Sequence, residues 1–269
     1  MRILVTTCDQ YLHLLTPYTI LFNKYWPNQD VTILGFDDLN IPELPDNFNY
    51  VSLGRQSDFG SYWTTPLIPY IDNIEEDYFT VLMGDIFITG HLDAGRVKLL
   101  EDEIISGNAE KALLDTHLNG YAIKYKEGIN KLSQRAPYRT TLHPAIWKKE
   151  YFKRYLKPNF TAWDFEIKNM PESQQDVATI ITPEGPPGIS VTDPEAVMMI
   201  SAPYNIFKGT NVYEKGVPFP RRGTKFPWGS PSGIRKEDIL LIYSYLPASD
   251  VVSKRKYLQD ELEEGKLYN

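Results

Sequence analysis

Short apolar runs separated by polar and turn-forming residues fill the first part of the chain, and they predict strands alternating with helices. One helix is expected over 10–26, with Asp9 as its cap. A second helix is expected over 57–73, where Pro66 and Pro69 interrupt the apolar spacing. Strands are expected around them at 2–7, 31–36, 49–53 and 79–88. This order predicts an α/β domain with a mixed, mostly parallel, Rossmann-like sheet flanked by helices.

The pattern continues through the middle of the chain with three further features. They are a helix over 93–105, a hairpin of strands 111–117 and 121–125 around Asn119-Gly120, and a helix over 144–156 that opens with a proline.

The composition changes after residue 182. Pro-Gly-rich pieces surround one strand candidate, 196–201, and a charged helix is expected over 253–266. We therefore expect a catalytic and nucleotide-binding core over 1–182. An irregular C-terminal extension over 183–269 is expected to pack on the same domain, with loops that could carry acceptor contacts.

One carboxylate interrupts the apolar run 79–88, which makes Asp85 the most informative residue of the sequence. An ionised carboxylate in apolar surroundings is costly unless it is hydrogen-bonded, paired or met by a cation. Ligands bind at the carboxyl ends of parallel strands, and Gly84 would let a ligand approach the backbone closely. Two interpretations stay open: Asp85 contacts a ligand, or it is a strand-end aspartate held by a cap or a salt bridge.

A second group of polar and aromatic residues lies at 161–166. On a helix, Trp163 and Glu166 share a face. A carboxylate beside an aromatic ring can act as a general base for a sugar hydroxyl, because partial desolvation raises its pKa while the ring packs on the sugar. The alternative is a plain helix start, with Thr161 as the cap and Asp164 and Glu166 favoured by the helix dipole.

Other predicted strand ends also carry groups that suit a nucleotide. Thr6, Thr7 and Asp9 leave the first strand, and 58–63 offers Asp, Ser, Tyr and Trp together. A base can stack on aromatic rings, and a cation bound by a carboxylate neutralises a diphosphate.

Composition narrows the function classes. The 269 residues are 42% hydrophobic, enough for a large core, and a net charge of −7 disfavours a broad nucleic-acid-binding surface. Cys8 is the only cysteine, which excludes an intrachain disulfide. Since no apolar run approaches the ~20 residues of a membrane span and the N-terminal run is short for a signal peptide, we expect a cytoplasmic protein.

Several sequence motifs of enzymes are absent. The chain has no Gly-rich dinucleotide fingerprint, phosphate loop, HExxH or GxSxG. Its histidines, His13, His91, His117 and His143, are isolated in the sequence. A multi-histidine metal site would need long-range assembly, so we interpret each as structural.

Five segments follow an order that resembles the GT-A-type nucleotide-diphospho-sugar glycosyltransferases, and specifically a loose group of bacterial and viral sugar transferases. They are ILVTT at 3–7, GSYW at 60–63, YFTVLMGDIFIT at 78–89, TLHPAIWKKEYF at 141–152 and TAWDFE at 161–166. The resemblance runs from residue 1 to about residue 170.

The resemblance implies a metal at the end of the central strand. In that family an acidic pair there holds Mn²⁺ or Mg²⁺ against the donor diphosphate, and the pair falls on Gly84-Asp85. Only one acid is present, which leaves three arrangements open: Asp85 holds the metal alone through waters, a second acid comes from elsewhere, or basic side chains replace the metal.

The resemblance also implies roles for other residues. Glu166, with Asp164 as the alternative, would be the general base of an inverting displacement, whereas a retaining mechanism would give the same acid another task. The implied donor contacts are Thr6, Thr7, Asp9, Tyr11, Ser61, Tyr62, Trp63 and Asp85. The implied acceptor contacts are Trp163 and His143, and His143 stands where the group has Gln.

The leading hypothesis is therefore a glycosyltransferase that moves a sugar from a nucleoside-diphosphate-sugar, such as a UDP-sugar, to an acceptor hydroxyl. A non-catalytic nucleotide- or carbohydrate-binding module is the alternative, favoured by Gly84, and a metal-dependent hydrolase ranks last. The acceptor stays open among polysaccharide, lipid-linked sugar and protein. A modified nucleobase would need a local patch of Arg221, Arg222 and Lys225.

Overall fold

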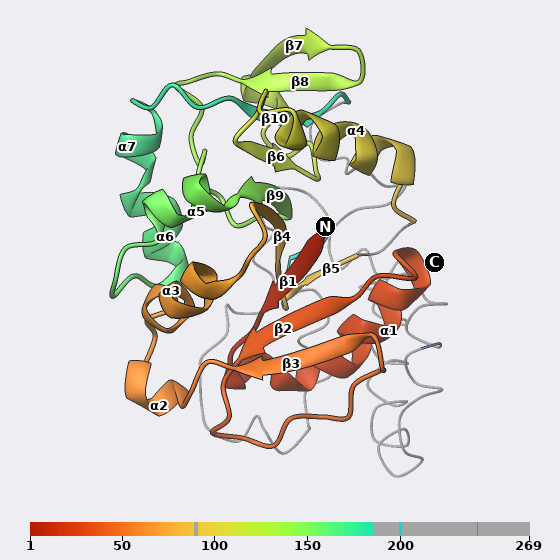
Figure 1. The fold of residues 1–269 in the computed structure, drawn as a ribbon, viewed down its shortest axis with the longest axis vertical. Helices are drawn as coiled ribbons and strands as arrows, with labels where there is room; N and C mark the ends of the chain where they lie inside the picture. Colours follow the sequence, from red (N-terminus) through yellow and green to blue (C-terminus); the bar gives the residue numbers. More distant parts are fainter. Residues whose placement is uncertain (89–90, 186–198, 201–240, 242–269) are drawn as a thin grey trace, which may run out of the picture.

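In the part of the chain that the structure describes, nine strands form one mixed sheet in the order β3-β2-β1-β4-β9-β6-β10-β8-β7 (Figure 1). The computed structural model describes residues 1–88, 91–185, 199–200 and 241, so the helix expected over 253–266 lies outside the described residues. The strands are β1 (Arg2–Thr6), β2 (Val31–Gly35), β3 (Phe48–Ser52), β4 (Tyr78–Met83), β6 (Lys111–Leu113), β7 (Ala122–Lys126), β8 (Ile129–Leu132), β9 (Ala145–Lys148) and β10 (Ile180–Pro183). A separate pair joins β5 (Ile86–Phe87) to β11 (Met199–Ile200).

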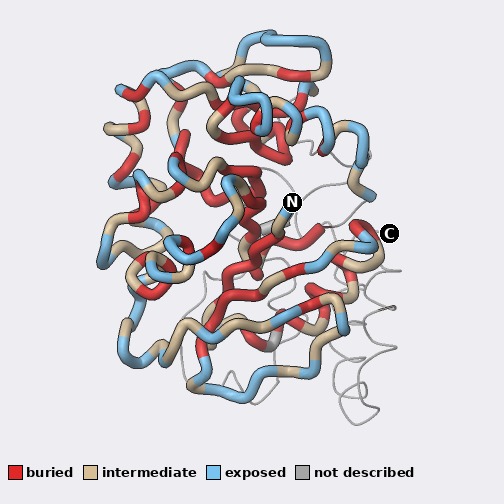
Figure 2. The backbone as a smooth tube through the Cα atoms, in the orientation of Figure 1, coloured by how far each residue is buried: buried red, intermediate tan, exposed pale blue. Residues whose placement is uncertain are grey.

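Helices cover both faces of this sheet. They are α1 (Leu15–Tyr25), α2 (Gln56–Phe59), α3 (Thr64–Asn73), α4 (Ala94–Ile105), α5 (Lys149–Tyr155), α6 (Ala162–Lys168) and α7 (Met170–Ser173). One core cluster joins α1 and α4 to a face of the sheet, and the other joins α3, α5 and α6 to the opposite face. The buried backbone in Figure 2 runs between these layers.

The predicted mixed α/β class is confirmed. The pairs β3-β2, β2-β1 and β1-β4 are all parallel, as the alternation of strands and helices predicts. Beyond β4 only β6 and β10 pair in parallel, and the other pairs are antiparallel. The expected strand at 196–201 is present as the two residues of β11.

We expected one strand over 79–88, but the structure has two strands there, β4 and β5. The chain leaves β4 after Met83, turns at Gly84-Asp85, and enters β5 of the second sheet. A Cβ on Gly84 would lie 3.2 Å from the Thr6 carbonyl oxygen and 3.3 Å from Thr7 Oγ1, so the glycine permits the turn to pack against the end of β1. Asp85 consequently lies in the turn, directly beyond the carboxyl end of the central strand.

The helix expected over 144–156 is wrong in its first half. Ala145, Ile146 and Trp147 form β9 between β4 and β6, and α5 begins only at Lys149. All three side chains have no exposed surface, because a central strand is covered on both faces and so loses the alternation of a half-exposed one. In the sequence, a short apolar run of this kind fits a segment of a buried helix equally well.

The hairpin expected around Asn119-Gly120 is also wrong. The observed hairpin joins β7 and β8 through Gly128, whose φ of 74° suits a tight turn. Asn119 instead begins a short 3₁₀ turn, where its side chain donates to the carbonyl oxygens of Pro183 and Gly185.

The helices expected over 10–26 and 57–73 need correction, whereas the helix over 93–105 and the helix start at Thr161 are confirmed. A 3₁₀ turn (Asp9–Leu14) precedes α1, and Asp9 lies in its first turn without capping it. The expected helix at 57–73 is split into α2 and α3. Asp93 caps α4, and Thr161 caps α6 in a capping box with Asp164.

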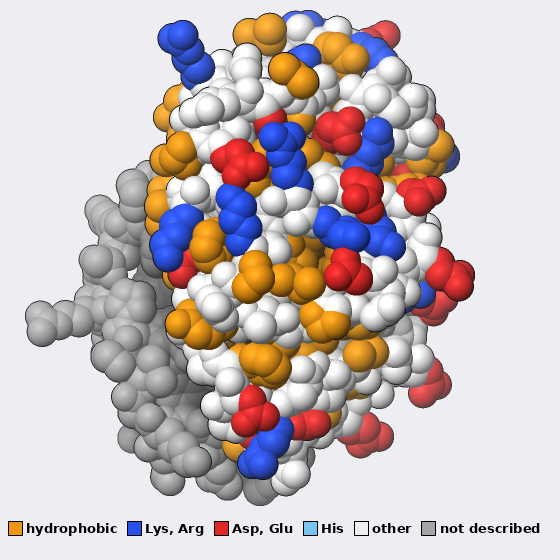
Figure 3. Space-filling model, turned by 60° about the vertical axis from the view of Figure 1, so that its left-hand side comes forward, with side chains coloured by type: hydrophobic (Ala, Val, Ile, Leu, Met, Phe, Trp, Pro, Cys, Tyr) orange, Lys and Arg blue, Asp and Glu red, His pale blue; other side chains and the backbone are white. Residues whose placement is uncertain are grey.

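Basic residues on α5 and just beyond it are paired with acids. Lys153 of α5 lies 2.8 Å from Asp72. Arg154 of α5 and Lys157, two residues past its end, both contact Glu172. Figure 3 shows Lys and Arg side chains interspersed with Asp and Glu on the face it presents, together with scattered apolar side chains. No helix among the described residues has the length and apolar character that a membrane crossing requires.

A fully buried ion pair joins Arg139, in the segment before β9, to Asp176, in the segment between α7 and β10. Arg139 donates to Asp176 Oδ1 at 3.0 Å and to three carbonyl oxygens, those of Ser133, Ser173 and Ala178. The other Asp176 oxygen accepts from the hydroxyls of Tyr151 and Tyr155. A buried charge pair with this many partners is satisfied only while every member is present.

Candidate functional site

The strand directions bring three segments to one edge of the sheet. Because β9 is antiparallel to both β4 and β6, the carboxyl ends of β4 and β6 meet the amino end of β9. Val81 of β4 and Leu113 of β6 both pair with Ala145 of β9. The residues just beyond those positions, Asp85, Asp115, His117 and His143, therefore lie at the same edge.

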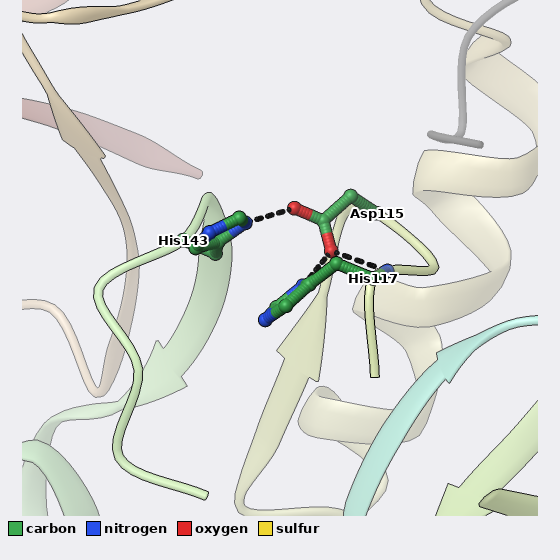
Figure 4. A group of neighbouring side chains, drawn as sticks. All are labelled: Asp115, His117 and His143. Atoms are coloured by element: carbon green, nitrogen blue, oxygen red, sulfur yellow. Dashed lines mark hydrogen bonds and ion pairs between the residues drawn. The ribbon is translucent and has the colours of Figure 1, made fainter. Parts of the chain in front are cut away.

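Asp115, His117 and His143 form a compact cluster, which Figure 4 shows with both imidazoles turned toward the carboxylate. His143 Nδ1 lies 2.7 Å from Asp115 Oδ2, and His117 Nδ1 contacts Asp115 Oδ1. The two rings stack with their centroids 3.7 Å apart. One ligand atom from each residue lies within 4.8 Å of the others, so this group could bind a metal.

The three groups shift one another's pKa values. Burial alone would raise the pKa of Asp115, but the charges and hydrogen bonds of His117 and His143 hold it well below its usual range. Burial lowers the pKa of His117 despite the attraction of Asp115. For His143, burial again acts to lower the pKa, but Asp115 and Glu166 outweigh it and raise the value.

Asp85, just beyond the end of β4, is electrostatically coupled to His143 of this cluster. Burial raises its pKa to about 6, with a further contribution from the charge of Glu166 and an opposing one from His143. The Asp85 charge also acts on the fully buried Tyr18 hydroxyl of α1, whose pKa burial raises. The charge of Glu166 therefore acts on both Asp85 and His143.

Glu166 is held in place by the loop that leads to β9. Its Oε1 accepts hydrogen bonds from Leu142 N at 2.6 Å and from Thr141 Oγ1 at 3.0 Å. Among the described residues, both hydrogen bonds to this carboxylate go to Oε1, so Oε2 keeps its accepting capacity. Glu166 therefore has the fixed orientation and the free lone pairs that a general base needs.

The neighbouring residues of α6 are placed differently. Asp164 Oδ2 accepts from Thr161 N, and Oδ1 lies 2.8 Å from Lys168 Nζ, so this carboxylate serves the helix. Trp163 is 69% exposed and leaves its ring available on the surface. Glu166 is the acid of this segment that meets the cluster.

The end of β1 carries polar atoms without partners. Thr7 Oγ1, Asp9 Oδ1 and Tyr18 OH are all buried, and none has a hydrogen-bond partner in the part of the chain that the structure describes. Thr6 Oγ1, by contrast, donates to Met83 Sδ, and Tyr11 packs against the core cluster of α1. Buried polar atoms are nearly always paired in folded proteins, so a group of unpaired ones suits a bound ligand.

Residues 61–63, which were expected to border the nucleotide, are only partly exposed. Ser61 and Tyr62 are exposed, whereas Trp63 is half-buried and packs edge-on against Phe152 and Phe165. Trp63 thus connects this segment to the core beneath α6.

Sequence reasoning missed Lys111, Asp115, His117 and Tyr18. Lys111 is fully buried under the cluster, where Nζ donates to the carbonyl oxygens of Arg139 and Thr141 and lies 3.9 Å from the centre of the Trp147 ring. Burial lowers its pKa well below the usual value. The Asp-x-His spacing at 115–117 could have indicated a candidate site, but we expected these residues to belong to a strand over 111–117.

No protein-family model matches the chain, and no curated protein matches it. Among solved structures, the chain is similar to a cytidylyltransferase from Leptospira borgpetersenii at 11% identity and a TM-score of 0.42, over 77% of this chain and 84% of that one. It is similar to S. aureus TarS at 13% identity and a TM-score of 0.43, over 70% of this chain and 36% of that one.

A third similar structure is the galactosyltransferase LgtC in complex with donor and acceptor sugar analogues, at 10% identity and a TM-score of 0.37, over 70% of this chain and 88% of that one. Likenesses of this size carry nothing about substrate, metal or mechanism.

Proposed function

We propose that this protein is a glycosyltransferase that moves a sugar from a nucleoside-diphosphate-sugar to an acceptor hydroxyl. The observation that supports this most is the electrostatic coupling of Asp85, Glu166 and His143 at the carboxyl edge of the sheet, together with the unpaired buried atoms of Thr7 and Asp9 that follow β1. Ligands bind at this edge in α/β folds, and a ligand with several hydrogen-bonding groups would satisfy these atoms.

On this proposal the donor lies across the ends of β1 and β4. The end of β1 and the exposed segment before α3 contact the nucleoside, and Asp85 faces the diphosphate. The residues assigned to the donor are Thr6, Thr7, Asp9, Tyr11, Ser61, Tyr62, Trp63 and Asp85.

The oxygen atoms around Asp85 suit a hard cation. Thr7 Oγ1 packs near Gly84 and is unpaired among the described residues, and Asp85 adds a carboxylate. Mg²⁺ or Mn²⁺ takes such ligands and keeps several waters. When bound, the cation would neutralise the donor diphosphate.

Glu166 acts as the general base in this proposal, because its free Oε2 can take the proton of the acceptor hydroxyl. The exposed Trp163 ring offers a face on which an acceptor sugar packs, and His143 is electrostatically coupled to both Glu166 and Asp85. Asp164 is the weaker candidate for the base, since both of its oxygens are engaged within α6.

A non-catalytic binding module remains the competing function, and the packing of Gly84 bears on it. The glycine is explained by its contact with Thr6 and Thr7, so the missing second acid is no sign of lost activity.

Thermal unfolding with a panel of nucleoside diphosphates, with and without Mn²⁺, tests the donor site. A ligand present at 100 times its Kd stabilises the native state by about 2.7 kcal/mol. We expect at least one nucleoside diphosphate to raise the Tm and Asp85→Asn to reduce that rise, whereas Asp30→Asn, which changes an exposed carboxylate, leaves it intact. No shift with any of them would exclude the proposed donor site.

A further inference from the structure

We propose that Asp115, His117 and His143 bind a first-row divalent transition-metal ion. The three residues come from two loops, and no other group of three such ligand side chains lies so close together in the part of the chain that the structure describes. This inference rests on the cluster's own geometry and goes beyond the transferase proposal, which assigns a cation to Asp85 and Thr7.

The distances match the size of a coordination sphere. Metal bonds to His nitrogen and carboxylate oxygen are about 2.0–2.2 Å long, so ligand atoms on opposite sides of an ion lie about 4.4 Å apart. The ligand atoms of the cluster all lie within 4.8 Å of one another. Neighbouring ligand atoms of a tetrahedral ion lie about 3.3 Å apart, so His143 Nδ1 and Asp115 Oδ2, now 2.7 Å apart, would have to separate by about 0.6 Å.

Both loops are held rigidly next to their ligands. Leu114 N donates to Pro144 O at 2.8 Å, directly between Asp115 and His143. Thr182 Oγ1 donates to the Asp115 carbonyl oxygen at 2.8 Å. Such support keeps the ligands near their binding positions before an ion arrives, which reduces the ordering cost of binding.

The charges around the cluster favour a cation. The carboxylates of Asp115 and Glu166 act on His143, and the Asp85 carboxylate is coupled to both His143 and Glu166. Lys111 Nζ, an ammonium group that also acts on His143, is already engaged with two carbonyl oxygens and the Trp147 ring. Three carboxylates, those of Asp85, Asp115 and Glu166, are therefore coupled to or act on His143.

The donor set determines which ions fit. Imidazole nitrogen prefers Zn²⁺, Co²⁺ and similar ions, whereas Mg²⁺ and Ca²⁺ prefer oxygen ligands. Three protein ligands leave at least one coordination position for water or a substrate oxygen, as in catalytic rather than structural zinc sites. The ion would be different in kind from one held by Asp85 and Thr7.

Titration of the metal-free full-length protein with Co²⁺, followed by visible absorption, tests the inference. We expect one equivalent to bind, Zn²⁺ to displace it, and Mg²⁺ to leave it in place. His117→Ala and His143→Gln should each weaken binding by about tenfold or more, as loss of a ligand or its support does in other sites. His91→Ala, which changes an exposed histidine away from the cluster, should bind Co²⁺ as the wild type does.

Circular dichroism of each variant shows whether it is folded, and the use of two separate histidine variants keeps the test valid if one fails to fold. Absence of Co²⁺ binding would show that the three side chains form only a hydrogen-bonded group. Loss of binding in Asp85→Asn but not in the histidine variants would assign the ion to Asp85, and both results overturn the inference. Neither result depends on whether a nucleotide-sugar binds.

Discussion

The raised pKa of Asp85 makes the stability of the fold depend on pH in a direction that can be predicted. In the folded protein this pKa is about 6, against an ordinary value of 3.8, chiefly because burial penalises the charged form. The unfolded chain therefore loses its Asp85 proton at a lower pH than the native state does. The stabilisation that comes with the protonated carboxyl is complete below the ordinary pKa and is lost as the pH rises through 6.

Replacing Asp85 with Asn removes this penalty. A shift of about two pKa units corresponds to a ceiling of about 3 kcal/mol, and partial exposure of the side chain reduces the expected effect to about 1–2 kcal/mol. Relative to the wild type, Asp85→Asn should thus gain about this much unfolding free energy between about pH 3 and pH 7.5.

Urea unfolding at several pH values across this range measures the difference. Asp30→Asn, at an exposed position, serves as the matched control and should show a difference from the wild type that does not change with pH. If the difference between Asp85→Asn and the wild type is equally flat, the carboxylate is not buried as the structure has it and the reasoning fails.

Three further predictions concern the framework of the site. Asp176→Ala leaves the Arg139 charge buried without its partner and should cost about 3–5 kcal/mol in urea unfolding; a loss below 1 kcal/mol would contradict the buried pair. Gly84→Ala should cost about 1–3 kcal/mol, because the added Cβ meets the backbone at Thr6, and an unchanged Tm would argue against that close approach. Thr161→Ala removes the cap of α6 and should cost about 1 kcal/mol, with Thr161→Ser restoring most of it.

Local patterns were sufficient to predict the parallel half of the fold. The apolar runs of β1, β2 and β3 have clear boundaries, and the cap at Asp93 marks the start of α4. β9 was missed because a strand buried on both faces has no period that distinguishes it from a helix, and only its pairing with β4 and β6 settles its form.

The candidate site was predictable in part. Asp85 stood out because a charge in an apolar run needs a compensating environment, and Glu166 stood out through its aromatic neighbours. The meeting of His117 and His143 on Asp115 could not be foreseen, since residues 26 positions apart become neighbours only through the antiparallel pairing of β6 and β9. Lys111 gave no signal, because burial of a lysine depends on carbonyl groups that its own segment does not supply.

Hydrolysis of nucleotide-sugars by the purified protein tests the proposed activity most directly, since a glycosyltransferase slowly transfers its donor sugar to water when the acceptor is missing. We expect release of sugar from at least one nucleoside-diphosphate-sugar in a panel. The rate should fall by about tenfold or more in Asp85→Asn and stay unchanged in Asp30→Asn. Binding of a nucleotide-sugar without hydrolysis by the wild type, or hydrolysis at an equal rate in Asp85→Asn, would contradict the assignment of this edge as a glycosyltransferase donor site.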